Sequence, residues 1–136
     1  MKIMLSVAIW SLVGFCAVQA QVIVANTNVK VAEISKSDLV DLFTGASSDF
    51  NDGQHAVPIT LKSGAVHEAF LDKYIGKNDK LFRAAWIRLV FAGRATMPQA
   101  FDNEEALIQH VASTPGAIGY VSTLPDNPKV KSLLVK

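Results

Sequence analysis

Cysteine is almost absent from this chain of 136 residues, because the sequence contains only Cys16. Cys16 lies in an apolar N-terminal stretch that we interpret as a signal peptide, and the chain from Gln21 onward has no cysteine. A chain without cysteine forms no disulfide, offers no thiol nucleophile and holds no cysteine-based metal site. The three histidines form no i, i+4 pair with an acidic third ligand. We therefore expect neither a metal site nor a cofactor.

An excess of charge of either sign is also absent. The sequence has 13 Lys and Arg residues against 12 Asp and Glu residues, and removal of Lys2 with the signal peptide makes the two kinds equal. The basic residues are scattered along the sequence, without a stripe of alternating basic and aromatic residues. We therefore expect no nucleic-acid binding, and contact with a membrane only through a protein partner.

The N-terminal stretch has the parts of a secretory signal peptide. Lys2 supplies the positive charge, residues 3–18 are mostly apolar, and Ala20 is a small residue where a signal peptidase would cleave. The apolar run is too short to serve as a membrane anchor. We predict a signal peptide over residues 1–20, a single domain over residues 21–136 and a periplasmic location.

Apolar periodicity and turn residues divide the domain into alternating strands and helices. Ser, Asp and Asn residues stand where helices would be capped, and Gly residues stand where helices would end. This order predicts one small α/β domain with a mixed sheet of about four to five strands covered by helices. The predicted strands are 22–25, 57–61, 117–121 and 130–135, and the predicted helices span about 36–45, 66–76, 79–93 and 103–113.

The helix over residues 79–93 has the strongest pattern of the four. Its apolar residues recur at helical spacing and predict a broad buried face. Trp86 belongs to this pattern, so we interpret it as a core residue and not as a platform for a ligand. The predicted buried face consists of Leu81, Phe82, Ala85, Trp86, Leu89 and Val90.

Several segments occur in the order and at the spacing of a known family. Thr114 to Val121 reads TPGAIGYV, a helix stop followed by an apolar strand, and residues 86–94 read WIRLVFAGR. Residues 34–45, 50–53 and 57–59 read ISKSDLVDLFTG, FNDG and VPI, and Phe70 and Pro98 stand at matching positions. Together these segments resemble the phosphate-type periplasmic solute-binding proteins of the type II superfamily. The WIRLVFAGR segment is similar to that of short members with a single lobe, so the resemblance implies the fold of one such lobe.

The resemblance also implies a binding loop. The family's Gly-Ser-Gly-Thr-Arg loop aligns with the residues before Phe70, and it holds phosphate through hydroxyls, a guanidinium and backbone N–H groups. Here Gly64, Val66 and His67 stand where the family has Ser, Thr and Arg, so two hydroxyls and one fixed charge are missing. We therefore expect weak or absent oxyanion binding. The residues that we expect to contact such an anion are Lys62, Ser63, Gly64, Ala65, Val66, His67 and Arg94.

These observations favour a binding module over an enzyme. We expect a module that binds phosphate or another small oxyanion weakly in a transport or sensing system. The alternative is an accessory module of the cell envelope that has lost solute binding and contacts a transporter, receptor or sensor. A hydrolase triad of Ser63, His67 and Asp72 remains a third possibility, because triads assemble in space and not along the sequence.

Overall fold

The structure is a computed structural model, and it describes residues 21–136. The predicted signal peptide lies outside the described residues. No helix within residues 21–136 is long and apolar enough to cross a membrane. In chain order the elements are β1 (Val22–Asn26), β2 (Glu33–Ile34), α1 (Lys36–Thr44), β3 (Val57–Leu61), α2 (Ala65–Phe70), the π-helical turn η1 (Leu71–Ile75), α3 (Asp79–Phe91), β4 (Gln99–Phe101), α4 (Glu104–Ser113), β5 (Ala117–Val121) and β6 (Val130–Val135).

The strands form one mixed sheet in the order β2-β6-β1-β5-β3-β4. β1 runs antiparallel to its two neighbours, β5 and β6. β3 runs parallel to both β5 and β4, so these three strands end at the same edge of the sheet. This edge brings together segments that are far apart in the sequence.

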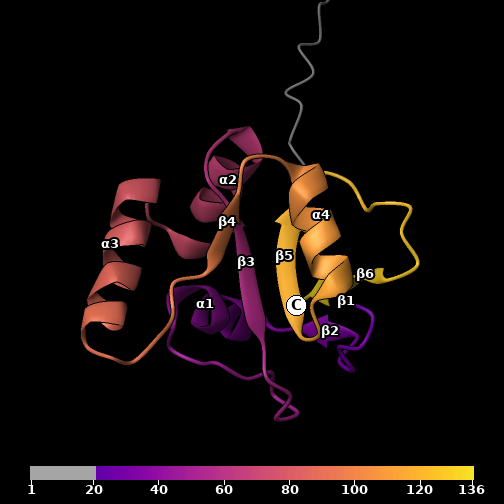
Figure 1. The fold of residues 1–136 in the computed structure, drawn as a ribbon, viewed down its shortest axis with the longest axis horizontal. Coiled ribbons are helices and arrows are strands. Elements are labelled where there is room, and N and C mark those ends of the chain that lie inside the picture. The colour runs from indigo at the N-terminus through magenta and orange to yellow at the C-terminus, as the bar shows by residue number, and fades with distance from the viewer. Residues whose placement is uncertain (1–20) are drawn as a thin grey trace, which may run out of the picture.

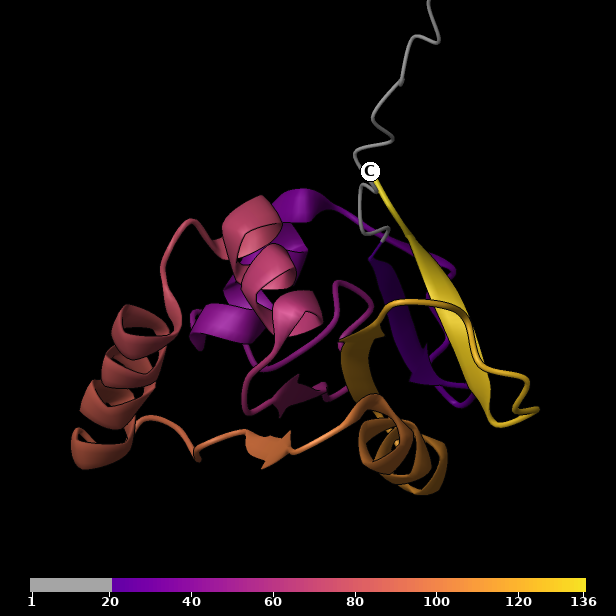
Figure 2. The same cartoon turned by 90° about the horizontal axis from the view of Figure 1, so that it is seen from above.

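Helices cover both faces of the sheet (Figures 1 and 2). Helix α4 packs on one face, across β1, β3 and β5, while α1, α2 and η1 lie on the other face. Helix α3 stands at the side of the molecule, where its main contact is with α1. The predicted α/β class is confirmed, and the sheet has six strands because the short β2 and β4 add to the four predicted ones.

The predicted helix caps are confirmed by the structure. Each capping side chain accepts a hydrogen bond from the backbone N–H three residues further along the chain. Helix α1 then ends at Gly45, which has a φ of 79° that favours glycine. The capping residues are Ser35, Asn78 and Asn103.

The core is centred on aromatic rings from three elements. Tyr120 of β5 stacks on Phe70 of α2 with ring centroids 3.9 Å apart, and Phe43 of α1 meets Phe70 edge-on at 5.0 Å. Trp86 is 4% exposed, and its Nε1–H donates to the carbonyl of Phe43 at 2.9 Å. The prediction that Trp86 is a core residue is therefore confirmed, and its hydrogen bond ties α3 to α1.

The predicted buried face of α3 is too broad. Phe82 and Trp86 are buried, but Leu81 is 55% exposed and Val90 is 41% exposed. Periodicity predicts which residues share one side of a helix, but it does not predict how much of that side meets a neighbour. Because α3 lies at the side of the molecule, only a narrow stripe of it is covered.

Candidate functional site

The carboxyl ends of β3, β4 and β5 surround a shallow pocket of about 390 Å³. Ser63, Gly64, Ala65 and Val66 follow β3 and start helix α2, and Ser122 follows β5. In open α/β sheets, ligands bind beyond the carboxyl ends of parallel strands. The pocket is lined by Leu61, Ser63, Gly64, Ala65, Val66, Asp102, Asn103, Glu104 and Ser122.

Two carboxylates from the end of β4 and the start of α4 already satisfy donors at this pocket. Glu104 accepts hydrogen bonds from the backbone N–H of Ser122 and, at 3.0 Å, from the Ser122 hydroxyl. Asp102 lies 3.3 Å from the ammonium group of Lys62, and both side chains are largely exposed. The chain's own carboxylates therefore neutralise part of the positive potential that an oxyanion would need.

A cluster of polar side chains around His67 lies next to the pocket but faces the core. His67 is 1% exposed. Its Nδ1 lies 2.5 Å from the Tyr120 hydroxyl, and its Nε2 lies 2.7 Å from a carboxylate oxygen of Asp79. The hydroxyl of Tyr120 also accepts a hydrogen bond from the N–H of Leu61 at 2.9 Å. These contacts join α2, α3, β3 and β5 at one point.

The hydrogen bonds of this cluster fit one consistent arrangement of donors and acceptors. The Tyr120 oxygen accepts from Leu61, so its O–H is available to donate to Nδ1 of His67. Nε2–H then donates to Asp79, whose other oxygen accepts from Nε–H of Arg83 at 2.8 Å. Both ring nitrogens of His67 and the Tyr120 hydroxyl thus have hydrogen-bond partners, as buried polar groups require.

The pKa values of two members follow from this environment. Burial raises the pKa of the Tyr120 hydroxyl far above its usual range. Burial would also raise the pKa of Asp79, but the hydrogen bonds from Arg83 and His67 and the positive charge of Arg83 outweigh it and lower the pKa. Asp79 is therefore ionised at neutral pH, which supports the proton arrangement described above.

The structure brings together only part of the predicted ligand set. Ser63, Gly64, Ala65 and Val66 line the strand-end pocket, with Lys62 beside them. His67 does not face the pocket, because both of its ring nitrogens are engaged in the core. The imidazole is not exposed to solvent either.

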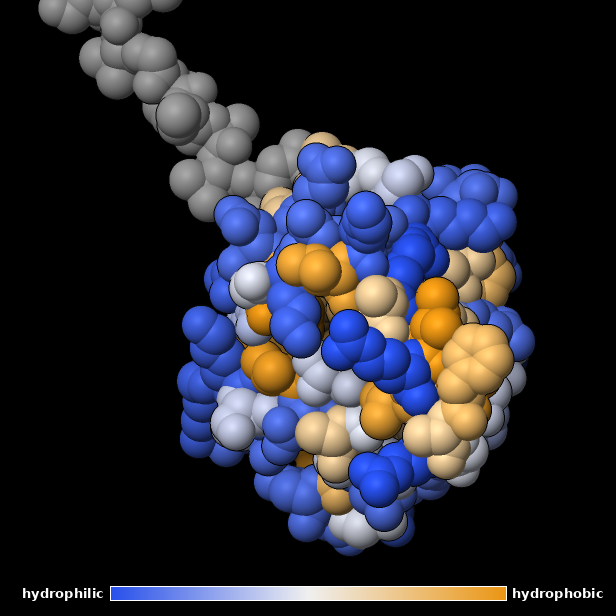
Figure 3. Space-filling view, turned by 90° about the vertical axis from the view of Figure 1, so that its left-hand side faces the viewer, coloured by the Kyte–Doolittle hydropathy of each residue, from blue (hydrophilic) through white to orange (hydrophobic). Residues whose placement is uncertain are grey.

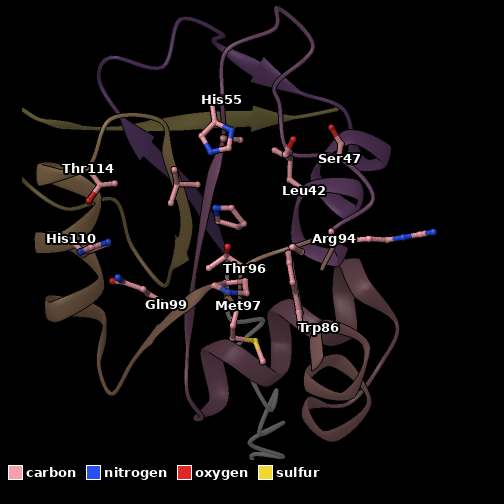
Figure 4. A pocket seen from close by; sticks show the side chains of 17 residues that line it. Leu42, Ser47, His55, Trp86, Arg94, Thr96, Met97, Gln99, His110 and Thr114 are labelled. Carbon is pink, nitrogen blue, oxygen red and sulfur yellow. The ribbon is translucent and has the colours of Figure 1, made fainter. Parts of the chain in front are cut away.

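Arg94 lies at a different place, beside a second pocket of about 450 Å³ near the start of β3. Figure 4 shows that its side chain points away from the space between His55, Thr96 and Met97. The lining of this second pocket is mainly apolar and includes Trp86, so it does not resemble an oxyanion site. The two pockets do not share a lining residue.

The contacts of His67 also bear on the hydrolase alternative. A triad would require His67 to bond to Ser63 and to Asp72. The imidazole bonds to Tyr120 and Asp79 instead, and it is buried. The structure thus contains no geometric basis for this triad.

Within residues 21–136, no group of three His, Cys, Asp or Glu side chains could hold a metal ion.

Sequence reasoning missed the acidic half of the strand-end pocket. Asp102, Asn103 and Glu104 reach the pocket because β4 pairs with β3, and β4 has only three residues. Such a short strand leaves no periodic signal. The available signal was the order of the elements, since a strand before the α4 helix would place Asp102 and Glu104 at the ends of its neighbours.

By shape, the described residues are similar to part of several solved phosphate-binding proteins. No protein-family model matches the sequence, and no curated protein matches it by sequence. Solved structures match by shape, and the chain spans less than half the length of the ones it matches.

One match is a phosphate ABC transporter substrate-binding protein from Clostridium perfringens, whose structure contains bound phosphate. It has a TM-score of 0.65 and 17% identity, and the match covers 85% of this chain and 44% of that protein. Another is an ABC-type phosphate transport receptor from Vibrio cholerae, with a TM-score of 0.61, 13% identity, and coverage of 85% and 45%. Identities this low show the fold alone. They agree with the single-lobe fold that the sequence resemblance implies.

Proposed function

We propose that this chain is an exported, non-enzymatic solute-binding module whose strand-end pocket binds a small oxyanion weakly. The observation that carries the proposal is the convergence of Ser63, Gly64, Ala65 and Ser122 on one pocket where β3 and β5 end. Hydroxyls and backbone N–H groups at such a position are the donors that an oxyanion needs. The likeness to phosphate-binding proteins supports the choice of phosphate as the first ligand to test.

The weakness of the proposed binding has a specific cause. Glu104 accepts both donors of Ser122, and Asp102 lies beside Lys62. A phosphate that entered the pocket would approach these two carboxylates and would have to displace Glu104 from Ser122. The described lobe by itself also does not enclose an anion as two hinged lobes would.

Isothermal titration calorimetry with phosphate, sulfate and a neutral sugar tests this function. We expect a dissociation constant of about 1 mM or weaker for phosphate and no heat with the sugar. Ser63→Ala should weaken phosphate binding further, whereas Ser37→Ala, which removes an exposed hydroxyl from α1, should leave it unchanged. A submicromolar constant for the wild-type protein would contradict the proposal.

The second candidate is an accessory module of the envelope that has lost solute binding. The observation that favours it is the same Glu104 carboxylate, which occupies the place of an external anion at Ser122. This module would act in the periplasm on a transporter, receptor or sensor. It predicts no heat with phosphate even at high concentration, and reproducible crosslinks to one envelope protein in intact cells. A crosslinking experiment that returns no envelope protein would contradict it.

A further inference from the structure

Positive charge is concentrated in the part of the chain that contains α3. Residues 77–94 hold five Lys or Arg residues against one carboxylate, Asp79. The rest of residues 21–136 holds seven Lys or Arg residues against eleven Asp or Glu residues. Residues 21–136 carry equal numbers of basic and acidic residues, but the positive charges are concentrated in one segment and the remainder is negative.

The outward face of α3 is also apolar. Leu81 is 55% exposed, Ile87 is 44% exposed and Phe91 is 88% exposed. Their spacing places them on the side of the helix opposite the buried Phe82 and Trp86. Figure 3 looks onto this side of the molecule and shows apolar side chains set among strongly hydrophilic ones.

The cations near Phe91 are not neutralised by neighbours. Arg88 and Arg94 are both exposed, and within residues 21–136 neither has an ion-pair partner. Asp79 is engaged with Arg83 and His67 at the other end of the helix. These two cations therefore flank Phe91, the most exposed of the large apolar side chains within residues 21–136.

Acidic groups around the start of α3 increase the difference in net charge between the two ends of this helix. Glu68 and Asp72 line a hollow together with Lys77 and Lys80, so the positive charge is partly balanced there. No carboxylate lies between residues 80 and 101 in the sequence. The segment from Arg88 to Arg94 is thus the part of the surface best suited to a negatively charged partner.

We propose that the outward face of α3 docks on an anionic phospholipid bilayer. Phe91, Ile87 and Leu81 would enter the boundary between headgroups and acyl chains, while Arg88 and Arg94 would contact lipid phosphates. The proposal concerns a different surface from the strand-end pocket and does not depend on oxyanion binding. It departs from the sequence-based expectation that membrane contact needs a protein partner.

Two observations favour a bilayer over an acidic protein. Phe91 is almost fully exposed at the end of the helix, so it can enter a soft interface without a groove that matches its shape. The negative remainder of the molecule would also turn α3 toward an extended anionic surface and keep the other faces away from it. Both features favour a large, flat anionic surface, and neither requires a partner of complementary shape.

Vesicle cosedimentation tests the proposal. The purified protein, with its N-terminus defined by mass spectrometry, is mixed with phosphatidylcholine vesicles with or without phosphatidylglycerol. We expect binding only with phosphatidylglycerol, and its loss at high salt. Arg88→Gln with Arg94→Gln should weaken binding about tenfold or more, because each basic residue near such a surface contributes about fivefold. Lys36→Gln with Lys129→Gln removes two exposed cations elsewhere and should change binding little.

A second matched pair of variants tests how much an apolar side chain contributes to vesicle binding. Phe91→Ser should weaken vesicle binding several-fold, whereas Leu124→Ser, which alters another exposed residue, should not. Thermal unfolding of each variant checks that the fold is intact. Equal binding to both kinds of vesicle, or equal binding by all variants, would overturn the proposal. So would a dimer in sedimentation velocity that Phe91→Ser disperses, because a second copy would then cover this face.

Discussion

Nε2 of His67 lies 2.7 Å from a carboxylate oxygen of Asp79, in a position where the sequence resemblance implies a solute ligand. The contact links α2 to the first turn of α3, and Nδ1 extends the link to Tyr120 of β5. A side chain that stands where the family has a ligand arginine thus serves the packing of the chain itself. In this chain, the side chain at that position contacts Tyr120 and Asp79 and does not face the pocket.

Loss of the imidazole should destabilise the fold. His67→Ala removes one buried and one partly buried hydrogen bond and leaves the Tyr120 hydroxyl without its acceptor, so we expect a loss of about 2–4 kcal/mol in the free energy of unfolding. Urea denaturation followed by circular dichroism measures this loss. His55→Ala is the matched control, because the His55 side chain is 71% exposed and its removal should cost little. Equal stability of the two variants would show that the cluster is not structural.

Removal of one hydroxyl tests the same cluster with a smaller change in structure. Tyr120→Phe keeps the ring that stacks on Phe70 but leaves the N–H of Leu61 and Nδ1 of His67 without their partner. We expect a loss of about 1–3 kcal/mol in the free energy of unfolding. Tyr74→Phe, which removes the other tyrosine hydroxyl, should change it by less, since Tyr74 is only partly buried.

The lowered pKa of Asp79 predicts how stability depends on pH. A carboxyl whose pKa is lower in the folded state stabilises the fold above its unfolded pKa of about 3.9. That contribution is lost as the pH falls through the folded pKa. The difference in unfolding free energy between wild type and Asp79→Asn should be full above about pH 5 and should shrink below about pH 4. A difference that grows as the pH falls would contradict this assignment.

Two glycines with positive φ should differ in their response to alanine. Gly116 has a φ of 80°, and a Cβ there would lie 2.4 Å from the carbonyl oxygen of His55. Gly53 has a φ of 87°, but nothing lies within 4 Å of its Cβ position. Both substitutions cost about 1 kcal/mol of backbone strain, and Gly116→Ala should cost about 1–3 kcal/mol more. Denaturation of the two variants measures the difference, and equal losses would mean that the close approach to His55 is absent.

Local signals predicted most of the fold. Ser35, Asn78 and Asn103 were recognisable as caps because a capping side chain acts within one turn of the chain. The four longer strands were recognisable from apolar runs bounded by turn residues. β2 and β4 were not, because two or three residues carry no period and pair only when distant strands are already in place.

The candidate site was predicted only in part, since its other half depends on tertiary contacts. Ser63 to Val66 were implied by the loop they share with a known family. The direction of the His67 side chain was not, because it is set by Tyr120 and Asp79, which are 53 and 12 residues away. The contact of Glu104 with Ser122 was not predicted either, because it depends on the pairing of β4 with β3.

Phosphate titration of Glu104→Gln tests the central claim, that Glu104 holds the donors an oxyanion would use. The variant removes a negative charge from the pocket and weakens the hold on the Ser122 donors, so phosphate should bind about tenfold more tightly than to the wild type. Glu105→Gln removes an exposed carboxylate from the same turn of α4 and is the matched control, which should change the affinity by less. If Glu104→Gln binds phosphate no better than Glu105→Gln does, Glu104 is not what limits binding at this pocket and the account is wrong.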